Sequence, residues 1–164
     1  MITLKRILVA TDFSEPSHTA LVYGRALART FGARIDLFHV IENAFLRPMV
    51  ENPHAVRNAA WETLNTCLTD EERKTKSVRP VLETSDHTAD AIVDYAKKES
   101  VDLIVLGTEG RGTMAQVLVG SVAEHVVRMA PCPVLTVRQP EHEFVVGESA
   151  PPIGYADFDE TGAS

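Results

Sequence analysis

The stretch that decides the fold is DLIVLGTEGRG, residues 102–112, which is followed by an apolar segment and then by GSVAE at residues 120–124. Leu103–Leu106 is a continuous apolar run, which is typical of a strand buried on both faces of a parallel sheet. Gly107 falls where that strand must end, and three glycines in six residues leave their backbone N–H groups without Cβ shielding. The stretch therefore predicts a strand followed by a turn whose backbone can approach a phosphate closely.

A helix is expected to begin at Ser121, directly after Gly120. Ser121 and Glu124 have the spacing of a capping box, and the apolar residues that follow give the helix an inner face. A glycine-rich turn close to a helix N-terminus can form an anion site, because both present backbone N–H groups. The spacing matches neither the GxGxxG nor the Walker A pattern, and taken alone it fits an ordinary strand-to-helix turn equally well.

The rest of the chain alternates short apolar runs with amphipathic segments. The expected strands are Arg6–Ala10, Arg34–Ile41, Ser77–Glu83, Leu103–Leu106 and Pro133–Arg138. The expected helices run from Ser14, as N-cap, to a stop at Gly32, over Ala55–Lys74 and Ala89–Glu99, and from Ser121 to Met129. Pro80 predicts that the third strand lies at an edge of the sheet. This alternation predicts an α/β fold with a single doubly wound, five-stranded parallel sheet and helices on both faces.

Two side chains within these elements could be taken for ligand contacts. A lone histidine in a strand usually packs with a satisfied ring nitrogen, and this is the interpretation we favour for His39. Trp61 lies in a regular helical stripe, which favours a core or interface residue over a stacking platform.

The composition describes one domain with an acidic tail. At 164 residues, 45% of them hydrophobic, the chain is long enough for one substantial core. Residues 139–164 hold six acidic residues and no Lys or Arg, so six of the seven net negative charges lie there. We expect a domain over residues 1–138, followed by an acidic tail that is disordered or that packs on its own domain or a partner.

Charge and hydropathy exclude several classes of function. The sequence has no basic stripe of the kind that non-specific nucleic-acid binding requires. It also has neither a signal-peptide pattern nor an apolar run of membrane-spanning length, so a cytoplasmic protein without membrane partners is expected. Cys67 and Cys132 are the only cysteines and lie far apart in the sequence, which argues against a disulfide framework or a zinc site.

The order Gly107-x-x-Gly110, nine further residues and Gly120-Ser121 resembles the nucleotide-binding signature of the universal stress protein family, in its ATP-binding subgroup. The resemblance extends to KRILVATDFS at residues 5–14, DLFHVIE at 36–42 and VGSVAEHVVRMAPCPVLTV at 119–137, and it spans roughly residues 1–138. It implies the strand order 3-2-1-4-5. Ligands of such sheets bind outside the carboxyl ends of the strands where the order reverses, here between the first and fourth strands.

The resemblance and the side-chain chemistry assign roles at that point. The Asp12 carboxylate could accept from an amino group or a ribose hydroxyl, and the backbone of Val40 could bind a purine edge; taken alone, Asp12 fits a turn residue bonded to its own backbone. Arg111 could pair with a phosphate. The expected cofactor is ATP or another adenine nucleotide, with or without Mg²⁺. The candidate cofactor-binding residues are Ala10, Thr11, Asp12, Val40, Gly107, Gly110, Arg111, Gly120, Ser121 and Val122.

Three residues depart from the family pattern. Glu109 stands where a histidine is common, Gln116 where the family often carries a basic residue, and Ser85 replaces a common glycine. A carboxylate beside the phosphate path is unfavourable unless it points away or helps to hold a metal. These departures weigh against tight triphosphate binding more than against adenine binding.

Several functions remain open at this point. The leading hypothesis is a nucleotide-binding stress-response or signalling protein that acts as a homodimer through its last strand, Pro133–Arg138, as the resemblance implies. The second is a dimeric interaction protein that needs no nucleotide. A slow ATPase is also open, although only Glu109 and His125 offer a general base by residue type. An adenylylating enzyme has fold-level analogy alone in its favour.

Overall fold

Five parallel strands form one sheet in the order β3-β2-β1-β4-β5, which confirms the predicted order. The strands are β1 (Arg6–Ala10), β2 (Arg34–Glu42), β3 (Val78–Ser85), β4 (Leu103–Gly107) and β5 (Val134–Val137). The computed structural model describes residues 1–43, 53–108 and 120–138. The candidates Gly110 and Arg111, the departures Glu109 and Gln116, and the acidic tail lie outside these residues.

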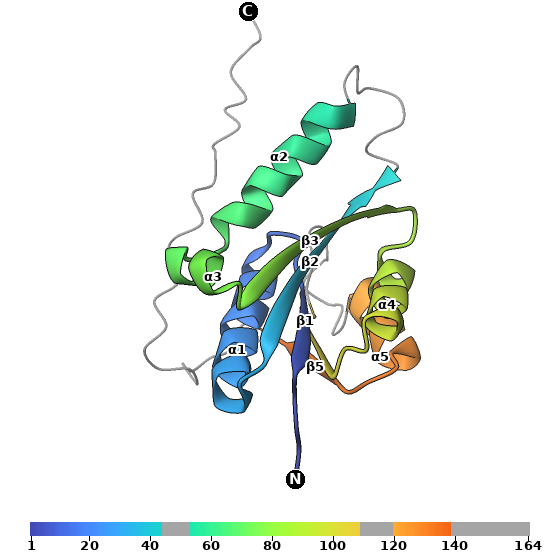
Figure 1. Cartoon of the computed structure of the whole chain (residues 1–164). Helices are drawn as coiled ribbons and strands as arrows, with labels where there is room; N and C mark the ends of the chain where they lie inside the picture. Colours follow the sequence, from blue (N-terminus) through green and yellow to red (C-terminus); the bar gives the residue numbers. More distant parts are fainter. Residues whose placement is uncertain (44–52, 109–119, 139–164) are drawn as a thin grey trace, which may run out of the picture.

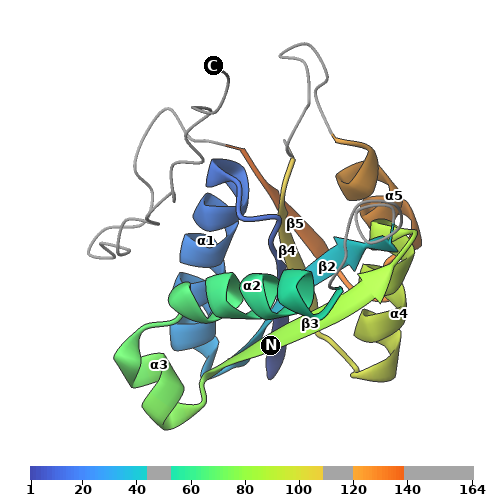
Figure 2. The same ribbon diagram turned by 90° about the horizontal axis from the view of Figure 1, so that it is seen from above.

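Helices cover both faces of the sheet, as predicted. One face carries α1 (Glu15–Phe31), α2 (Pro53–Thr66) and α3 (Asp70–Thr75), and the other carries α4 (Thr88–Lys98) and α5 (Ser121–Met129) (Figures 1 and 2). No helix in the described part of the chain combines the length and the apolar character that crossing a membrane requires.

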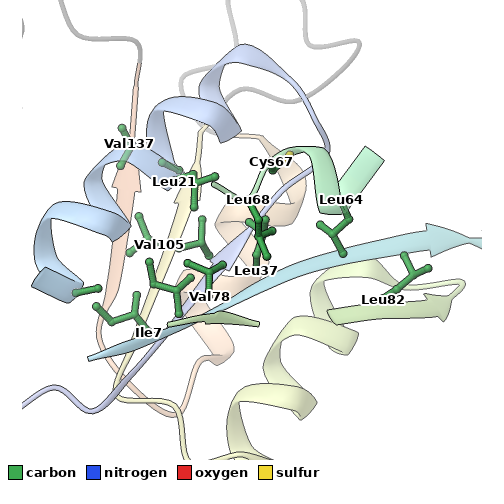
Figure 3. Packing of buried hydrophobic residues seen from close by; sticks show 14 of the residues in the cluster. Ile7, Leu21, Leu37, Leu64, Cys67, Leu68, Val78, Leu82, Val105 and Val137 are labelled. Carbon is green, nitrogen blue, oxygen red and sulfur yellow. The ribbon is translucent and has the colours of Figure 1, made fainter. Parts of the chain in front are cut away.

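Each face of the sheet has its own apolar core. Ile7, Leu37 and Val105 are fully buried beneath α1 and α2 (Figure 3), whereas Leu8 and Ile104 are fully buried on the face of α4 and α5. Because successive strand residues point to opposite faces, a continuous apolar run such as Arg6–Ala10 supplies both cores. The central strands are therefore held from two sides, and their ends are rigid places from which to build a site.

The edges of the sheet are β3 and β5. Pro80 lies in β3 opposite Leu37 of β2, so its missing N–H falls on an edge strand, as the sequence predicts. Strand β5 pairs with β4 alone, from Ile104 with Val134 to Gly107 with Val137.

The prediction of one helix over Ala55–Lys74 is wrong, because the chain breaks it into α2 and α3. The break buries Cys67 and Leu68 in the core, and a new helix begins after Thr69. Thr69 Oγ1 accepts a hydrogen bond from the Glu72 N–H at 3.2 Å, and the Glu72 carboxylate accepts one from the Thr69 N–H at 2.8 Å. This capping box, T-x-x-E, is a helix start that the sequence analysis passed over.

Two side chains on the elements around the core also differ from expectation. Trp61 is 44% exposed on α2, so the core half of its interpretation is wrong. Asp36 is fully buried in β2, although an acidic residue is rarely buried without a partner. Its carboxylate accepts hydrogen bonds from Arg79 Nε at 3.0 Å and from the Tyr95 hydroxyl at 3.1 Å, which makes its burial tolerable.

Candidate functional site

The turn that follows β1 carries the first group of candidate residues. Thr11 Oγ1 accepts a hydrogen bond from the Phe13 N–H at 3.0 Å, and Asp12 Oδ1 accepts one from the Ser14 N–H at 3.0 Å. Phe13 has a φ of +64°, a left-handed conformation that costs a bulky residue about 1 to 2 kcal/mol. Asp12 thus bonds its own turn through Oδ1, which is the plain structural role weighed for it above, and its contact with a ligand stays a prediction.

Helix α1 begins directly at this turn. Ser14 has the extended backbone of an N-cap, as predicted, but its hydroxyl bonds to Asp12 Oδ1 and makes no cap bond to the helix. Ser17, buried in the first turn of α1, donates to Ser14 O at 2.8 Å and lies 3.1 Å from Thr11 Oγ1. The turn and the helix start are therefore one hydrogen-bonded unit.

Strand β2 supports this turn from the side. Its last register partner with β1 is Phe38, opposite Ala10, and Phe38 O accepts from the Thr11 N–H at 2.9 Å. The next residue, His39, bonds to Thr11 O through Nδ1 at 2.8 Å, which confirms the interpretation of a satisfied ring nitrogen. Val40 is buried near the carboxyl end of β2, two residues after Phe38, which is the last register partner of β1.

The end of β4 lies against the start of α1. A Cβ added at Gly107 would come within 2.9 Å of Pro16 Cβ and 3.0 Å of the Pro16 carbonyl carbon. Real side chains do not tolerate such distances, so Gly107 is required by the packing of α1 over β4. The Gly107 region and the Asp12 turn are thereby brought to the same edge of the sheet, as the sequence predicts.

Thr108 ties three elements together just beyond β4. Its N–H donates to Val137 O of β5 at 3.0 Å, and its carbonyl accepts from the Gly120 N–H at 2.6 Å. A Cβ at Gly120 would lie 2.9 Å from this same carbonyl oxygen, so the close approach needs glycine. The start of α5 is thus fixed beside the end of β4.

The N-terminus of α5 differs in detail from the prediction. Gly120 is the N-cap, Ser121 is the first helical residue, and the helix has no side-chain cap bond, so the predicted capping box of Ser121 and Glu124 is wrong. The Gly120 N–H is used by Thr108 and cannot serve a ligand as expected. Within the described residues, the N–H groups of Ser121 and Val122 have no acceptor, and they carry the positive end of the helix dipole.

The residue after β4 carries a buried hydroxyl that has no partner among the described residues. Thr108 is 4% exposed, and its Oγ1 has no hydrogen bond to any residue that the structure describes. Leaving such a group unpaired costs about 1 to 3 kcal/mol, so a polar ligand that hydrogen-bonds to this hydroxyl would remove that cost.

The remaining titratable groups near α5 do not suggest catalysis. His125 lies on α5, and its Nε2 is 2.8 Å from Asp90 Oδ1 of α4, so this candidate base is tied to a carboxylate on the neighbouring helix. Across residues 1–43, 53–108 and 120–138, no group of three His, Cys, Asp or Glu side chains could hold a metal ion.

The sequence analysis gave Thr108 and Phe13 no role at this edge of the sheet and took His39 for a packing residue. Thr108 follows Gly107 directly, so its place beside the motif could have been read from the sequence. No local signal marks the left-handed backbone of Phe13 or the partner of His39. Both depend on how β2 lies against the end of β1.

Known proteins are similar to this chain in sequence and share its fold. The model of the universal stress protein family matches residues 3–138. A universal stress protein of Methanocaldococcus jannaschii is 33% identical over 150 residues, which cover 85% of this chain and 85% of that protein. The solved structure of the protein MJ0577 from the same organism has a TM-score of 0.70 and 26% identity, and covers 86% of this chain and all of that one.

Two more distant structures share the fold at a TM-score of 0.60. One is a universal stress protein in complex with cAMP, at 21% identity, covering 83% of this chain and 98% of that one. The other is the universal stress protein of Archaeoglobus fulgidus in complex with dAMP, at 22% identity, covering 84% of this chain and 99% of that one. With the family model matching most of its length, this chain belongs to the universal stress protein family.

Proposed function

We propose that this protein binds an adenine nucleotide where β1 and β4 end, and that it acts as a cytoplasmic, homodimeric stress-response or signalling protein. One observation carries the proposal. The turn that holds Asp12, the glycine that ends β4 and the open N-terminus of α5 lie at one edge, at the point where the strand order reverses. Relatives of the same fold in complex with cAMP and dAMP support an adenine ligand.

Each group of the site has a proposed role. The Asp12 carboxylate and the backbone of Val40 would bind the ribose or the base, while the N–H groups of Ser121 and Val122 and the Thr108 hydroxyl would donate to phosphate oxygens. The nucleotide supplies a phosphate chain whose negative charge the α5 dipole attracts. Gly110 and Arg111, and a Mg²⁺ ion carried by ATP, belong to the proposal as sequence-based expectations.

A second candidate function has one observation in its favour. Strand β5 lies at an edge of the sheet, and an edge strand offers unpaired backbone groups to a second copy of the chain. A dimeric interaction protein would need that edge and no nucleotide. A slow ATPase has no contact in its favour within the described residues, because Glu109 lies outside them and His125 contacts Asp90 of α4.

The proposal is tested by calorimetric titration of ATP and AMP into the wild type and two Ser121 variants. Ser121 is the first helical residue, where proline is tolerated, and Gly120 before it has the extended backbone (φ −65°, ψ 151°) that a residue preceding proline adopts. Ser121→Pro therefore removes one N–H donor without breaking α5, whereas Ser121→Ala keeps that N–H.

We expect saturable binding by the wild type, a loss of about tenfold or more in ATP affinity for Ser121→Pro, and a smaller loss for Ser121→Ala. Because AMP reaches fewer phosphate donors, its affinity should respond less to Ser121→Pro. A wild type that binds neither ATP nor AMP would overturn the proposal and favour the interaction protein. Analytical ultracentrifugation would then show whether that protein is a dimer.

A further inference from the structure

We infer that His39 is a positioning residue for this site: it holds the residues on either side of Asp12 and thereby fixes the turn that presents the Asp12 carboxylate. The inference rests on the proposed function, because the position of the Asp12 carboxylate matters for binding only if a nucleotide binds there. It concerns a side chain that the nucleotide signature does not include, and it is carried by contacts on three residues, Thr11, Phe13 and His39.

The first contact is the hydrogen bond of the His39 ring to Thr11, which takes the place of the next backbone hydrogen bond between β1 and β2. Regular pairing between β1 and β2 ends at Ala10 and Phe38, yet the Thr11 N–H still donates to Phe38 O at 2.9 Å. The Thr11 carbonyl then receives the His39 ring, at 2.8 Å from Nδ1. Two successive residues of β2 thus hold the N–H and the carbonyl of Thr11, and the second does so with its side chain.

This contact also settles the tautomer of His39. A carbonyl oxygen can only accept, so Nδ1 must carry the proton, and a neutral ring leaves Nε2 as the acceptor. Protonation of Nε2 leaves the Nδ1–H bond in place. The hold on Thr11 is therefore independent of the charge of the ring.

The second contact lies on the other side of Asp12. The Phe13 ring centroid is 4.3 Å from that of His39, with the rings tilted by 38°. Phe13 has a φ of +64°, a conformation that persists only where the surroundings determine it. Its neighbour Ser14 donates its N–H to Asp12 Oδ1 at 3.0 Å, so a change in the Phe13 backbone would also disturb this contact of the carboxylate.

The two contacts together bracket Asp12. Thr11 is held by the ring nitrogen and Phe13 by the ring face, so one imidazole sets the backbone on both sides of the carboxylate. A residue that only stabilised the fold would not need to reach both. A site residue must be held close to its productive geometry by groups of this kind, which is why we assign His39 to the site.

Two substitutions separate the hydrogen bond from the bulk of the ring. In His39→Asn the side-chain N–H can replace Nδ1–H toward Thr11 O, whereas His39→Leu fills a similar volume and offers no donor. His87→Asn and His87→Leu are the matched controls, because His87 is exposed just before α4.

The first measurement needs no nucleotide. Amide hydrogen exchange is followed by NMR at Phe13 and Ser14, whose N–H groups bond to Thr11 and Asp12, with Val9 in β1 as the reference for global opening. We expect His39→Leu to speed exchange at Phe13 and Ser14 about tenfold or more, with Val9 much less affected, and His39→Asn to remain near the wild type. Equal exchange in all the variants would overturn the inference.

The second measurement is calorimetric titration of ATP. We expect His39→Leu to lose about tenfold or more in affinity, equivalent to about 1.4 kcal/mol, and His39→Asn to stay within about threefold of the wild type. Loosened exchange in His39→Leu with wild-type affinity would overturn the inference, as would lost affinity with unchanged exchange. A wild type that binds no ATP but shows the expected exchange would refute the proposed function and leave the hold on the turn established.

Discussion

At the amino end of the sheet the buried carboxylate of Asp36 has a donor for each oxygen, whereas at the carboxyl end the buried hydroxyl of Thr108 has none among the described residues. Arg79 reaches both oxygens of Asp36, at 3.0 and 3.3 Å, and the Tyr95 hydroxyl donates at 3.1 Å. Arg6 completes the cluster, with Nε 3.6 Å from the carboxylate. The buried carboxylate in β2 is thus fully paired, whereas the buried hydroxyl after β4 is unpaired within the described residues.

The satisfied arrangement at the amino end extends beyond Asp36. The Asp102 carboxylate accepts from the backbone N–H groups of Lys5 and Arg6 at 2.8 and 2.9 Å, and Arg6 also pairs with Glu99. That bond is the main reason why the pKa of Glu99 is lowered. An open hollow of about 610 Å³ lies here, far from the candidate site, and its charges are mixed. Its lining residues are Lys5, Arg6, Gly32, Arg34, Glu99, Ser100 and Asp102.

The carboxyl end keeps features that cost stability. Phe13 is left-handed, the Thr108 hydroxyl is unpaired within the described chain, and the first N–H groups of α5 have no acceptor there. Features of this kind gather at ligand sites, because the ligand relieves them when it binds. The difference between the two ends supports the proposal that the carboxyl end binds a ligand, whereas the paired polar groups of the amino end stabilise the fold.

The largest expected effect breaks the amino end. Asp36→Ala removes the buried carboxylate that Arg6 and Arg79 share. Both arginines keep Glu99 as a partner and the Arg79 side chain is 49% exposed, so we expect the free energy of unfolding to fall by about 2 to 3 kcal/mol. Urea denaturation measures this, with Asp94→Ala, an exposed residue of α4, as the control. ATP affinity of the folded variant should stay close to the wild type. A loss of less than about 1 kcal/mol would show that the buried cluster contributes little to stability.

The next effect strains the packing beneath the site. Gly107→Ala puts a methyl group about 2.9 Å from Pro16 Cβ, so α1 must shift; we expect a destabilisation of about 1 to 3 kcal/mol and weaker ATP binding. Thr136→Ala on the neighbouring strand β5, where the side chain is exposed, is the control. Urea denaturation and calorimetry report the two effects. Wild-type stability in Gly107→Ala would contradict the packing reason for this glycine.

A smaller effect follows from the pH dependence of the amino end. Burial, and next the charge of Asp36, raise the pKa of Tyr95 to about 12. Below pH 10 the hydroxyl keeps its proton in folded and unfolded chains, so its contribution is complete. As the pH rises from 10 to about 12, the unfolded chain releases the proton first and the contribution is lost.

The measurement compares the wild type with Tyr95→Phe in urea. We expect a difference of about 1.5 kcal/mol at neutral pH, from the lost bond to the Asp36 carboxylate, and a shrinking difference above pH 10. Tyr23→Phe, on α1 at the other face of the sheet, is the matched control. A difference that stays constant up to about pH 12 would contradict the raised pKa.

The smallest expected change in the free energy of unfolding is an increase, whereas the substitutions above are expected to lower it. Thr108→Val replaces the unpaired hydroxyl with a methyl group of the same shape and should stabilise the free protein by about 1 kcal/mol. The same change should weaken ATP binding about tenfold, because the proposed donor to phosphate is gone. Thermal unfolding and calorimetry check the pair, with the exposed Thr136→Val as the control. Unchanged ATP affinity would remove Thr108 from the site.

Local sequence patterns predicted the elements well. The apolar runs of β1 and β4, the glycines at the ends of α1 and β4, and Pro80 in an edge strand follow from periodicity and backbone preferences within a few residues. The order of the strands came from the family resemblance. The capping box that splits α2 from α3 was present in the sequence, and it was missed because the helical composition of residues 55–74 concealed it.

The sequence by itself determined where the strands and most of the helices lie. With the strand order that the family resemblance implies, it also placed Asp12, Gly107 and the start of α5 at one edge of the sheet. Only the tertiary structure showed that Pro16 packs too closely on Gly107 for a side chain there. It also showed that Gly120, and not Ser121, is the N-cap of α5, and that the His39 ring bonds to the carbonyl of Thr11. The physical reason is the separation along the sequence between the residues that interact. Secondary structure depends on neighbours a few residues apart, whereas His39 and Thr11 are 28 residues apart, and Arg6 and Glu99 are 93 apart. Such pairs meet only when the sheet brings them together.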